Sequence, residues 1–155
     1  MTRHGKPRTG RNPIPGVLGF RRRRNMISVD RLDHLVLTVA DVERSLEFYE
    51  NILGMQPVTF QGERRAVRFG QQTIKLHAAS ELAEPTATHP VPGSANLCFV
   101  TGNALSEVQE HLRSNDVRIE AGPVVRTGTE GPITSLYLRD PDGNLIEIAR
   151  YDERE

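Results

Sequence analysis

Cysteine, tryptophan and long apolar runs are what this sequence most plainly lacks. It has one cysteine, Cys98, and no tryptophan among its 155 residues. A single cysteine excludes an intramolecular disulfide, so a disulfide-stabilised secreted domain is excluded and a reducing, cytoplasmic setting is expected. No apolar run approaches the roughly 20 residues that cross a membrane, so no membrane partner is expected. A chain of this length can form one domain with its own core, without structural zinc.

Acidic residues are absent from the first 25 positions, although the whole chain has 20 Lys or Arg and 20 Asp or Glu. Eight of the basic residues lie in 1–25, which leaves twelve basic against all twenty acidic residues in the remainder, a formal charge of −8. Because duplex binding depends on neutralising phosphates, we expect this acidic part not to bind nucleic acid.

Residues 1–28 are predicted to be a basic extension that is disordered. Three prolines and four glycines within it argue against packing. In the simplest interpretation Met26 begins the natural domain and the residues before it are an unstructured extension. A targeting peptide is one alternative, because the segment is rich in arginine and free of acid. A patch around Arg21–Arg24 for nucleic acid or an acidic surface is the other.

The folded part is predicted to run over 29–152, with a first module at 29–79. Residues 32–39 alternate as a strand does, with Leu35, Leu37 and Val39 on one side. Asp41 then has the position of a helix N-cap, and Gly54 is the expected stop. Three short strands are expected after this helix, at 56–60, 65–69 and 72–77.

The pattern restarts after a linker at 80–93, so that 94–152 is a second module. A strand at 95–100 leads into a helix from about Ala104 to Asn115. Further strands are expected near 117–119, 133–139 and 144–150, the last two joined by the turn at 140–144. An offset of 62 residues relates His34 to Asn96 and also Asp41 to Asn103, which supports an internal duplication.

The predicted fold class is α+β, with two βαβββ modules forming one curved eight-stranded mixed sheet. A single module is too small to cover its own sheet, so the two are expected side by side with both helices on the convex face. The concave face is then a natural cup for a small-molecule substrate and a metal ion.

Three side chains are expected to meet in this cup: His34, His77 and Glu147. Strand alternation places each of them on the face opposite its strongly apolar neighbours. Two imidazoles and one carboxylate suit one divalent ion (Fe, Mn, Zn or Ni) and leave positions for substrate and water. Glu147 lies within Leu-Ile-Glu-Ile-Ala, where a carboxylate is rarely buried without a partner. For His34 alone, a structural histidine is the alternative.

Asn96, Cys98 and Arg126 are candidates for binding substrate. Asn96 and Cys98 share one face of their predicted strand, although inert packing is the usual role of a buried cysteine. Arg126 begins a glycine-rich segment, 126–132, which is predicted to be either a lid at the mouth of the cup or a plain connection. His111 is expected on the solvent side of its helix, and His89 on the surface of the linker or at the rim of the cup.

Several motifs are typical of one superfamily: Asp33–Val39, Ser45–Tyr49 with Leu53–Met55, and Asp140–Glu147. On these residues the chain resembles the vicinal oxygen chelate superfamily, which includes glyoxalase I, extradiol dioxygenases and the fosfomycin- and bleomycin-resistance proteins. From about 30 to 151 it is most similar to the glyoxalase domain-containing protein 5 type, a likeness that extends to Lys75–His77, His89–Ser94 and Arg126–Gly128.

The resemblance implies metal ligands at His34, Lys75, Asn96 and Glu147. Lysine is protonated at neutral pH and asparagine is a weak ligand, so His77 is expected to replace the fourth-strand ligand. The resemblance also implies a base from carboxylates on the fourth and eighth strands in glyoxalase I chemistry, of which only Glu147 remains, as the predicted catalytic residue. In extradiol enzymes the second histidine comes from the fifth strand, where this chain has Asn96.

The leading expectation is a metal-dependent glyoxalase- or dioxygenase-type enzyme, either a lyase/isomerase or a ring-cleaving oxygenase, that acts on a small substrate with adjacent oxygens. A metal-free drug- or ligand-binding protein of the bleomycin-resistance type is the first alternative. A thiol transferase of the fosfomycin-resistance type is the second, and it would need a cation site near the cup. Because superfamily members often dimerise, a homodimer is expected.

Overall fold

A computed structural model describes residues 27–151 of the chain. Within this range the residues from Leu32 onward form one compact unit. The predicted basic extension, apart from residues 27 and 28, lies outside the described residues. The elements are β1 (His34–Val39), α1 (Val42–Asn51), β2 (Gln56–Phe60), β3 (Arg64–Phe69), β4 (Gln72–Ala78), β5 (Asn96–Val100), α2 (Leu105–Ser114), β6 (Ala121–Gly128), β7 (Gly131–Arg139) and β8 (Leu145–Tyr151). Two βαβββ modules follow each other along the chain, as predicted.

The first module begins its helix where the sequence predicts. The Asp41 side chain accepts a hydrogen bond from the Arg44 backbone N–H at 3.0 Å, which satisfies one of the free amides of the first turn of α1. Beyond α1, Gly54 adopts a positive φ of 66°, which a residue with a side chain rarely does, and the chain turns into β2. The strands then form a sheet in the order β1-β4-β3-β2.

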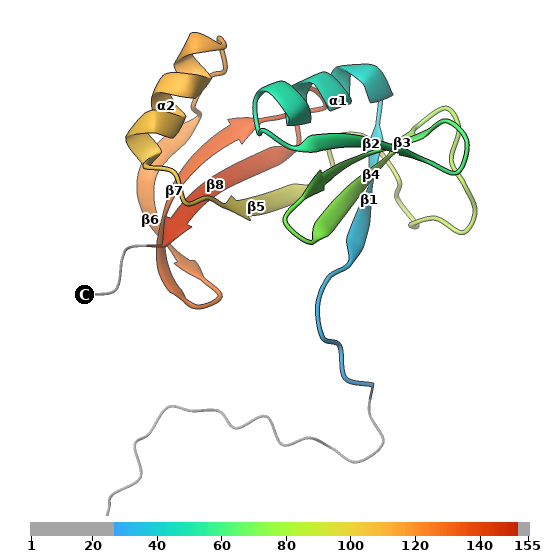
Figure 1. The fold of residues 1–155 in the computed structure, drawn as a ribbon, viewed down its shortest axis with the longest axis horizontal. Coiled ribbons are helices and arrows are strands. Elements are labelled where there is room, and N and C mark those ends of the chain that lie inside the picture. Colours follow the sequence, from blue (N-terminus) through green and yellow to red (C-terminus); the bar gives the residue numbers. More distant parts are fainter. Residues whose placement is uncertain (1–26, 152–155) are drawn as a thin grey trace, which may run out of the picture. The chain divides into compact units, whose positions relative to one another are not determined.

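The second module forms its own sheet in the order β5-β8-β7-β6. The eight strands therefore make two four-stranded sheets and do not form the one continuous sheet that was predicted. In the described part of the chain β1 is hydrogen-bonded only to β4 and β5 only to β8, so no pair of strands joins the two sheets. Figure 1 shows the two modules side by side, with α1 and α2 along the same side of the sheets.

The sixth strand corrects two sequence-based predictions. It lies at Ala121–Gly128 and not at 117–119, and it pairs with β7 in an antiparallel hairpin. The segment 126–132 is the tip of this hairpin, neither a lid nor a loose connection. Gly128 pairs with Gly131, and Gly131 has a φ of 137° that favours glycine, so only residues 129 and 130 form the turn.

One hydrophobic core joins the two modules on the helix side of the sheets. It contains residues from both sheets and both helices, including Leu37, Tyr49, Leu112, Leu136 and Ile146. Within residues 27–151 no helix is long and apolar enough to cross a membrane.

A buried polar network also connects the modules, centred on Asp140. The Tyr49 hydroxyl of α1 donates to Asp140 Oδ2 at 2.8 Å, and the Asn144 side chain donates to the same oxygen at 2.7 Å. Asn144 in turn accepts from the Ala95 backbone N–H at 2.8 Å. The turn at 140–144 therefore ties α1 of the first module to the start of β5 in the second.

The sheet sides that face away from the core are called the open faces here. Alternation places His34, Val36 and Thr38 of β1 on the open face of the first sheet, because Leu37 and Val39 are in the core. In the second sheet Cys98 and Glu147 are on the open face, because Ile146 and Ile148 are in the core. Val36 and Val100 are 47% and 60% exposed there, so one chain alone leaves much of both open faces uncovered.

Candidate functional site

A polar cluster lies on the open face of the second sheet, around Glu147 of β8. The strand register pairs Glu147 with Cys98 of β5 on one side and with Tyr137 of β7 on the other. Asn96 lies two residues before Cys98 and points to the same face. The structure therefore places the three candidate residues Asn96, Cys98 and Glu147 close together.

One oxygen of the Glu147 carboxylate is unsatisfied. It is the only acidic residue in any of the eight described strands. Its Oε1 atom is buried and has no hydrogen-bond partner among the described residues. A buried carboxylate oxygen without a donor is unfavourable, typically by about 1–3 kcal/mol or more. The site is therefore arranged to receive a proton, a ligand donor or a cation at this oxygen.

The surroundings of Cys98 shift the pKa of its thiol. Burial, the negative charge of Glu147 and a hydrogen bond to the Glu147 side chain together raise the pKa of Cys98 to about 11. Part of the Cys98 side chain still reaches solvent. At neutral pH this residue is a protonated thiol that can donate to the carboxylate, and it is not an activated nucleophile.

Arg126 and Tyr137 form the next part of the cluster. Arg126 Nε donates to the Tyr137 hydroxyl at 3.2 Å, and the guanidinium carbon lies 5.7 Å from the centroid of the tyrosine ring. Because Tyr137 pairs directly with Glu147, this contact places a cation near the carboxylate. Arg126 is thus positioned by the strand of a hairpin, where the sequence predicted a loop.

His34 and His77 lie at opposite ends of the first sheet. The register pairs His34 with Thr73 at the start of β1, and pairs His77 with Thr38 near its end. Four residue steps along these parallel strands correspond to about 13 Å, and both side chains stand roughly perpendicular to the sheet. The structure therefore does not bring His34 and His77 to one ion, contrary to the prediction of a His34–His77–Glu147 site.

His34 and His77 also have different surroundings. His34 Nδ1 lies 2.9 Å from Asp33 Oδ2 on an exposed part of the strand. His77 lines a polar pocket of about 550 Å³ with Glu63, Arg64 and Glu81. Burial lowers the pKa of His77, and the positive charges of Arg64 and Lys75 lower it further. His77 is accordingly a neutral pocket residue near two cations.

The duplication gives the physical reason for the misplaced histidine. Val36 pairs with Lys75 in the first sheet, and Cys98, which follows Val36 by the same 62-residue offset, pairs with Glu147 in the second. Lys75 is therefore the positional equivalent of Glu147, whereas His77 is the equivalent of Ala149. A shift of two residues along a strand keeps the face but moves the side chain about 7 Å along the sheet.

The described residues of one chain do not complete a metal site. Residues 27–151 contain no group of three His, Cys, Asp or Glu side chains close enough to hold an ion. Glu147, with its unpartnered buried oxygen, fits a cation, and the neighbouring Cys98 adds one soft donor. His34 belongs to the other sheet, and lysine, the residue type at position 75, is not among the usual metal ligands. Glu147, Cys98 and His34 therefore suit a divalent ion only if the open face of a first sheet and the open face of a second sheet lie against the same ion.

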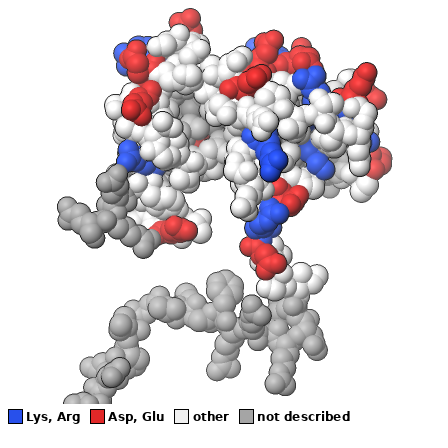
Figure 2. Space-filling view, in the orientation of Figure 1, with Lys and Arg blue, Asp and Glu red and all other residues white. Residues whose placement is uncertain are grey.

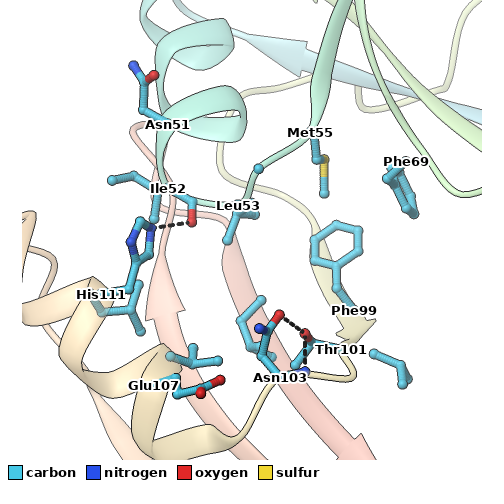
Figure 3. Close-up of a pocket in the computed structure, with 15 residues that line it drawn as sticks. Asn51, Ile52, Leu53, Met55, Phe69, Phe99, Thr101, Asn103, Glu107 and His111 are labelled. Carbon is cyan, nitrogen blue, oxygen red and sulfur yellow. Dashed lines mark hydrogen bonds between the residues drawn. The ribbon is translucent and has the colours of Figure 1, made fainter.

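A separate apolar pocket of about 490 Å³ lies on the helix side, between the end of α1, α2 and the inner face of the sheets. Figure 3 shows Phe69 and Phe99 on one wall and His111 opposite them. The two rings meet edge to face with centroids 5.3 Å apart. His111 Nε2 lies 3.0 Å from the Ile52 carbonyl oxygen, so this histidine links α2 to the end of α1. This role of His111 was not predicted from the sequence, because nothing in the local pattern of α2 indicates the contact.

The comparison with known families decides the identity of this fold. The family model of the Glyoxalase/Bleomycin resistance protein/Dioxygenase superfamily matches residues 31–148. The chain belongs to this superfamily. The Virulence protein STM3117 of Salmonella typhimurium is 50% identical over 123 residues, which cover 79% of this chain and 85% of that protein. The Glyoxalase domain-containing protein RDO1 of Mycosarcoma maydis is 43% identical over 143 residues, 90% of this chain and 81% of that protein.

Solved structures of the superfamily have the same fold. The integron cassette protein VCH_CASS1 from the mobile metagenome of V. cholerae matches with a TM-score of 0.80 and 49% identity, over 82% of this chain and 99% of that one. Enzymes of the superfamily are more distant in sequence. A lactoylglutathione lyase of Salmonella typhimurium is 32% identical over 76% of this chain and 90% of that enzyme. Biphenyl-2,3-diol 1,2-dioxygenase 3 of Rhodococcus globerulus is 28% identical over 79% of this chain and 64% of that enzyme.

Proposed function

We propose that this protein is a divalent-metal-dependent enzyme, of the lyase/isomerase or ring-cleaving oxygenase type, that acts on a small substrate with two adjacent oxygens. The observation that carries the proposal is Glu147, the only acid in the strands, with a buried oxygen that lacks a donor. The superfamily includes lyases and dioxygenases, which supports an enzyme of this kind. The single cysteine supports a reducing, cytoplasmic location.

The working site is proposed to form between two chains of a homodimer. β1 and β5 are edge strands whose open faces expose Val36 and Val100, and such edges are commonly covered by a partner. In a two-fold dimer, β1 of one chain can lie beside β5 of the other. His34 of one chain and Glu147 of the other would then belong to one cup, which supplies donors that a single chain lacks.

Glu147 and His34 would hold the ion, which is Fe, Mn, Zn or Ni by donor type, and Asn96, Cys98 and Arg126 would line the substrate space. A divalent ion bound there would supply charge stabilisation for the anion that develops on the two substrate oxygens. The Glu147 carboxylate is placed to hold or move a proton, and the Cys98 thiol donates to it. Arg126, held against Tyr137, orients negative charge on the substrate.

Elemental analysis of protein from metal-supplemented cells tests this proposal. The wild type is expected to hold about one ion per chain, and His34→Ala and Glu147→Ala are expected to lose it. His77→Ala is the matched control, because it removes an imidazole about 13 Å along the sheet from His34 and should keep the ion. Metal retained by both His34→Ala and Glu147→Ala would overturn the site.

A metal-free ligand-binding protein is the second candidate, and one observation favours it. The Lys75 ammonium lies at the position equivalent to Glu147 and would repel a divalent ion placed between the two modules. Wild-type protein that contains no metal after preparation without chelators, and that still binds a small ligand, would support this candidate over the enzyme. The thiol-transferase alternative would need a further cation site near the cup, and residues 27–151 contain no group of three His, Cys, Asp or Glu side chains that would supply one.

A further inference from the structure

The first sheet has an unusual charge distribution. Its four strands contain no Asp or Glu but four basic residues, Arg64, Arg65, Arg68 and Lys75. The described residues as a whole have eleven Lys or Arg against seventeen Asp or Glu. More than a third of the basic residues of this acidic domain therefore lie on two neighbouring strands, β3 and β4. The positive charge is concentrated on this sheet and is not spread evenly over the surface.

Three of these cations share the open face. Arg65 points to the helix side, where its Nη1 lies 3.0 Å from Glu43 Oε1 of α1. Arg64, Arg68 and Lys75 point the other way, because Lys75 pairs with Ala66 and shares its face. Within residues 27–151 none of these three forms an ion pair. The open face of the first sheet thus carries three positive charges without an ion-pair partner among the described residues.

The register places the three charges around one point. Lys75 lies directly opposite Ala66, and Arg64 and Arg68 flank Ala66 on the same strand. Diagonal neighbours in a sheet are about 7–8 Å apart at their Cα atoms, within reach of long side chains. Ala66 has no side chain beyond Cβ and is fully buried beneath them. The Lys75 Nζ lies 5.1 Å from the centroid of the Phe60 ring, which holds the ammonium over the sheet.

We infer that this face, formed by Arg64, Arg68 and Lys75, is an oxyanion-binding surface that takes a carboxylate or phosphate group of a small ligand. Like charges at these separations repel one another, and an oxyanion between them removes the repulsion. Guanidinium groups match the geometry of such oxygens through paired N–H donors. An extended polyanion is disfavoured, since it would also meet the surrounding acidic surface. Figure 2 shows blue surface on the first module below α1, with red along the helices and outer loops.

Among residues 27–151 the second sheet has no equivalent surface. Arg139 is paired with Glu120, with Nε 2.7 Å from Oε2, and Arg126 rests against Tyr137. Glu147 occupies the position that Lys75 has in the first sheet. An oxyanion-binding surface on the first sheet extends the proposed function. It rests on that function in one respect, namely that the bound ligand is the substrate of the enzyme. Its anionic group would lie on the first sheet and its reacting oxygens would lie at Glu147.

Titration of the metal-free protein with inorganic phosphate, at constant ionic strength and with amide NMR shifts as readout, tests the inference. Saturable shifts are expected at Ala66, Lys75 and their strand neighbours. Arg68→Gln combined with Lys75→Met is expected to weaken phosphate binding by about tenfold or more, since two charged donors are lost. The same titration with acetate distinguishes a carboxylate site from a phosphate site, and saturation by either supports an oxyanion surface.

Arg113→Gln is the matched control, because it makes the same change of charge on α2, where Arg113 pairs with Glu110. It should leave phosphate affinity unchanged. Glu147→Gln should also bind phosphate at least as well as the wild type, so loss of the proposed metal site leaves this result intact. Equal affinity in the wild type and the Arg68→Gln/Lys75→Met variant, or no saturable shift with either anion, would overturn the inference.

Discussion

Lys75 and Glu147 occupy equivalent positions in the two modules and carry opposite charges. Each pairs with the equivalent residue of its neighbouring parallel strand, Lys75 with Val36 and Glu147 with Cys98. The duplicated fold therefore presents a cation on one open face and an acid on the other. A ligand that contacts both open faces would meet an anion-binding surface at Lys75 and a proton- or metal-binding carboxylate at Glu147. This difference could fix the orientation of an asymmetric small molecule.

If a second chain covers the exposed edge of β5 in a homodimer, a single charged side chain introduced at that edge should disrupt the dimer. Val100→Glu would place a carboxylate in the proposed contact, where its desolvation costs several kcal/mol without a partner. The variant is expected to be monomeric at micromolar concentrations by light scattering. Val125→Glu is the control, because Val125 is 64% exposed on β6, at the opposite edge of the sheet. A dimer that is unaffected by Val100→Glu would exclude this interface.

A cup shared between chains predicts complementation in mixed dimers. His34→Ala and Glu147→Ala each remove a donor from both sites of their own homodimer. In random mixed dimers one site of the two regains both donors, so bound metal should recover to about a quarter of the wild-type content. Elemental analysis of co-expressed variants, with each variant alone as the control, measures this. If the mixture binds no more metal than the separate variants, the donors are not shared between chains.

The raised pKa of Cys98, about 11, predicts slow alkylation. Because the thiolate is the reactive form, a rise of two pKa units above the ordinary value of 9.0 lowers its fraction at pH 8 about 100-fold. The rate with iodoacetamide should rise steadily with pH up to about 11. Glu147→Gln removes a negative charge that disfavours the thiolate, so it should lower the pKa and speed alkylation at pH 8. Glu110→Gln on α2 is the control and should leave the alkylation rate unchanged. Equal alkylation rates in the Glu147→Gln and Glu110→Gln variants would contradict the contact between Cys98 and Glu147.

The Asp140 network predicts a stability effect that is separate from ligand binding. Tyr49→Phe removes the donor to Asp140 Oδ2 and leaves a buried carboxylate with fewer hydrogen bonds. A loss of about 1–3 kcal/mol in the free energy of unfolding is expected from urea titration. Tyr151→Phe, which removes the hydroxyl that accepts from the exposed Glu130 backbone N–H, should cost under about 0.5 kcal/mol. Similar values for the two variants would show that the network does not hold the modules together.

Local patterns in the sequence were sufficient for much of the fold. The Asp41 cap, the glycine that follows α1 and the alternation of β1 depend on residues within a few positions of each other, and the structure has them where the pattern predicts. The 62-residue offset predicted the duplication. Glu147 was identifiable because an acid within an apolar strand needs a partner wherever that strand lies.

Tertiary structure decided how these pieces meet. The distance between His34 and His77 depends on which residues of β1 and β4 pair, and no local pattern encodes that register. Each residue along a strand moves the side chain about 3.3 Å, and every second residue points to the same face. The alternation in the sequence therefore gave the correct face for His77, but its predicted position along the strand was wrong. The same long-range pairing separated the strands into two sheets, made 126–132 a hairpin and gathered Arg64, Arg68 and Lys75 around Ala66.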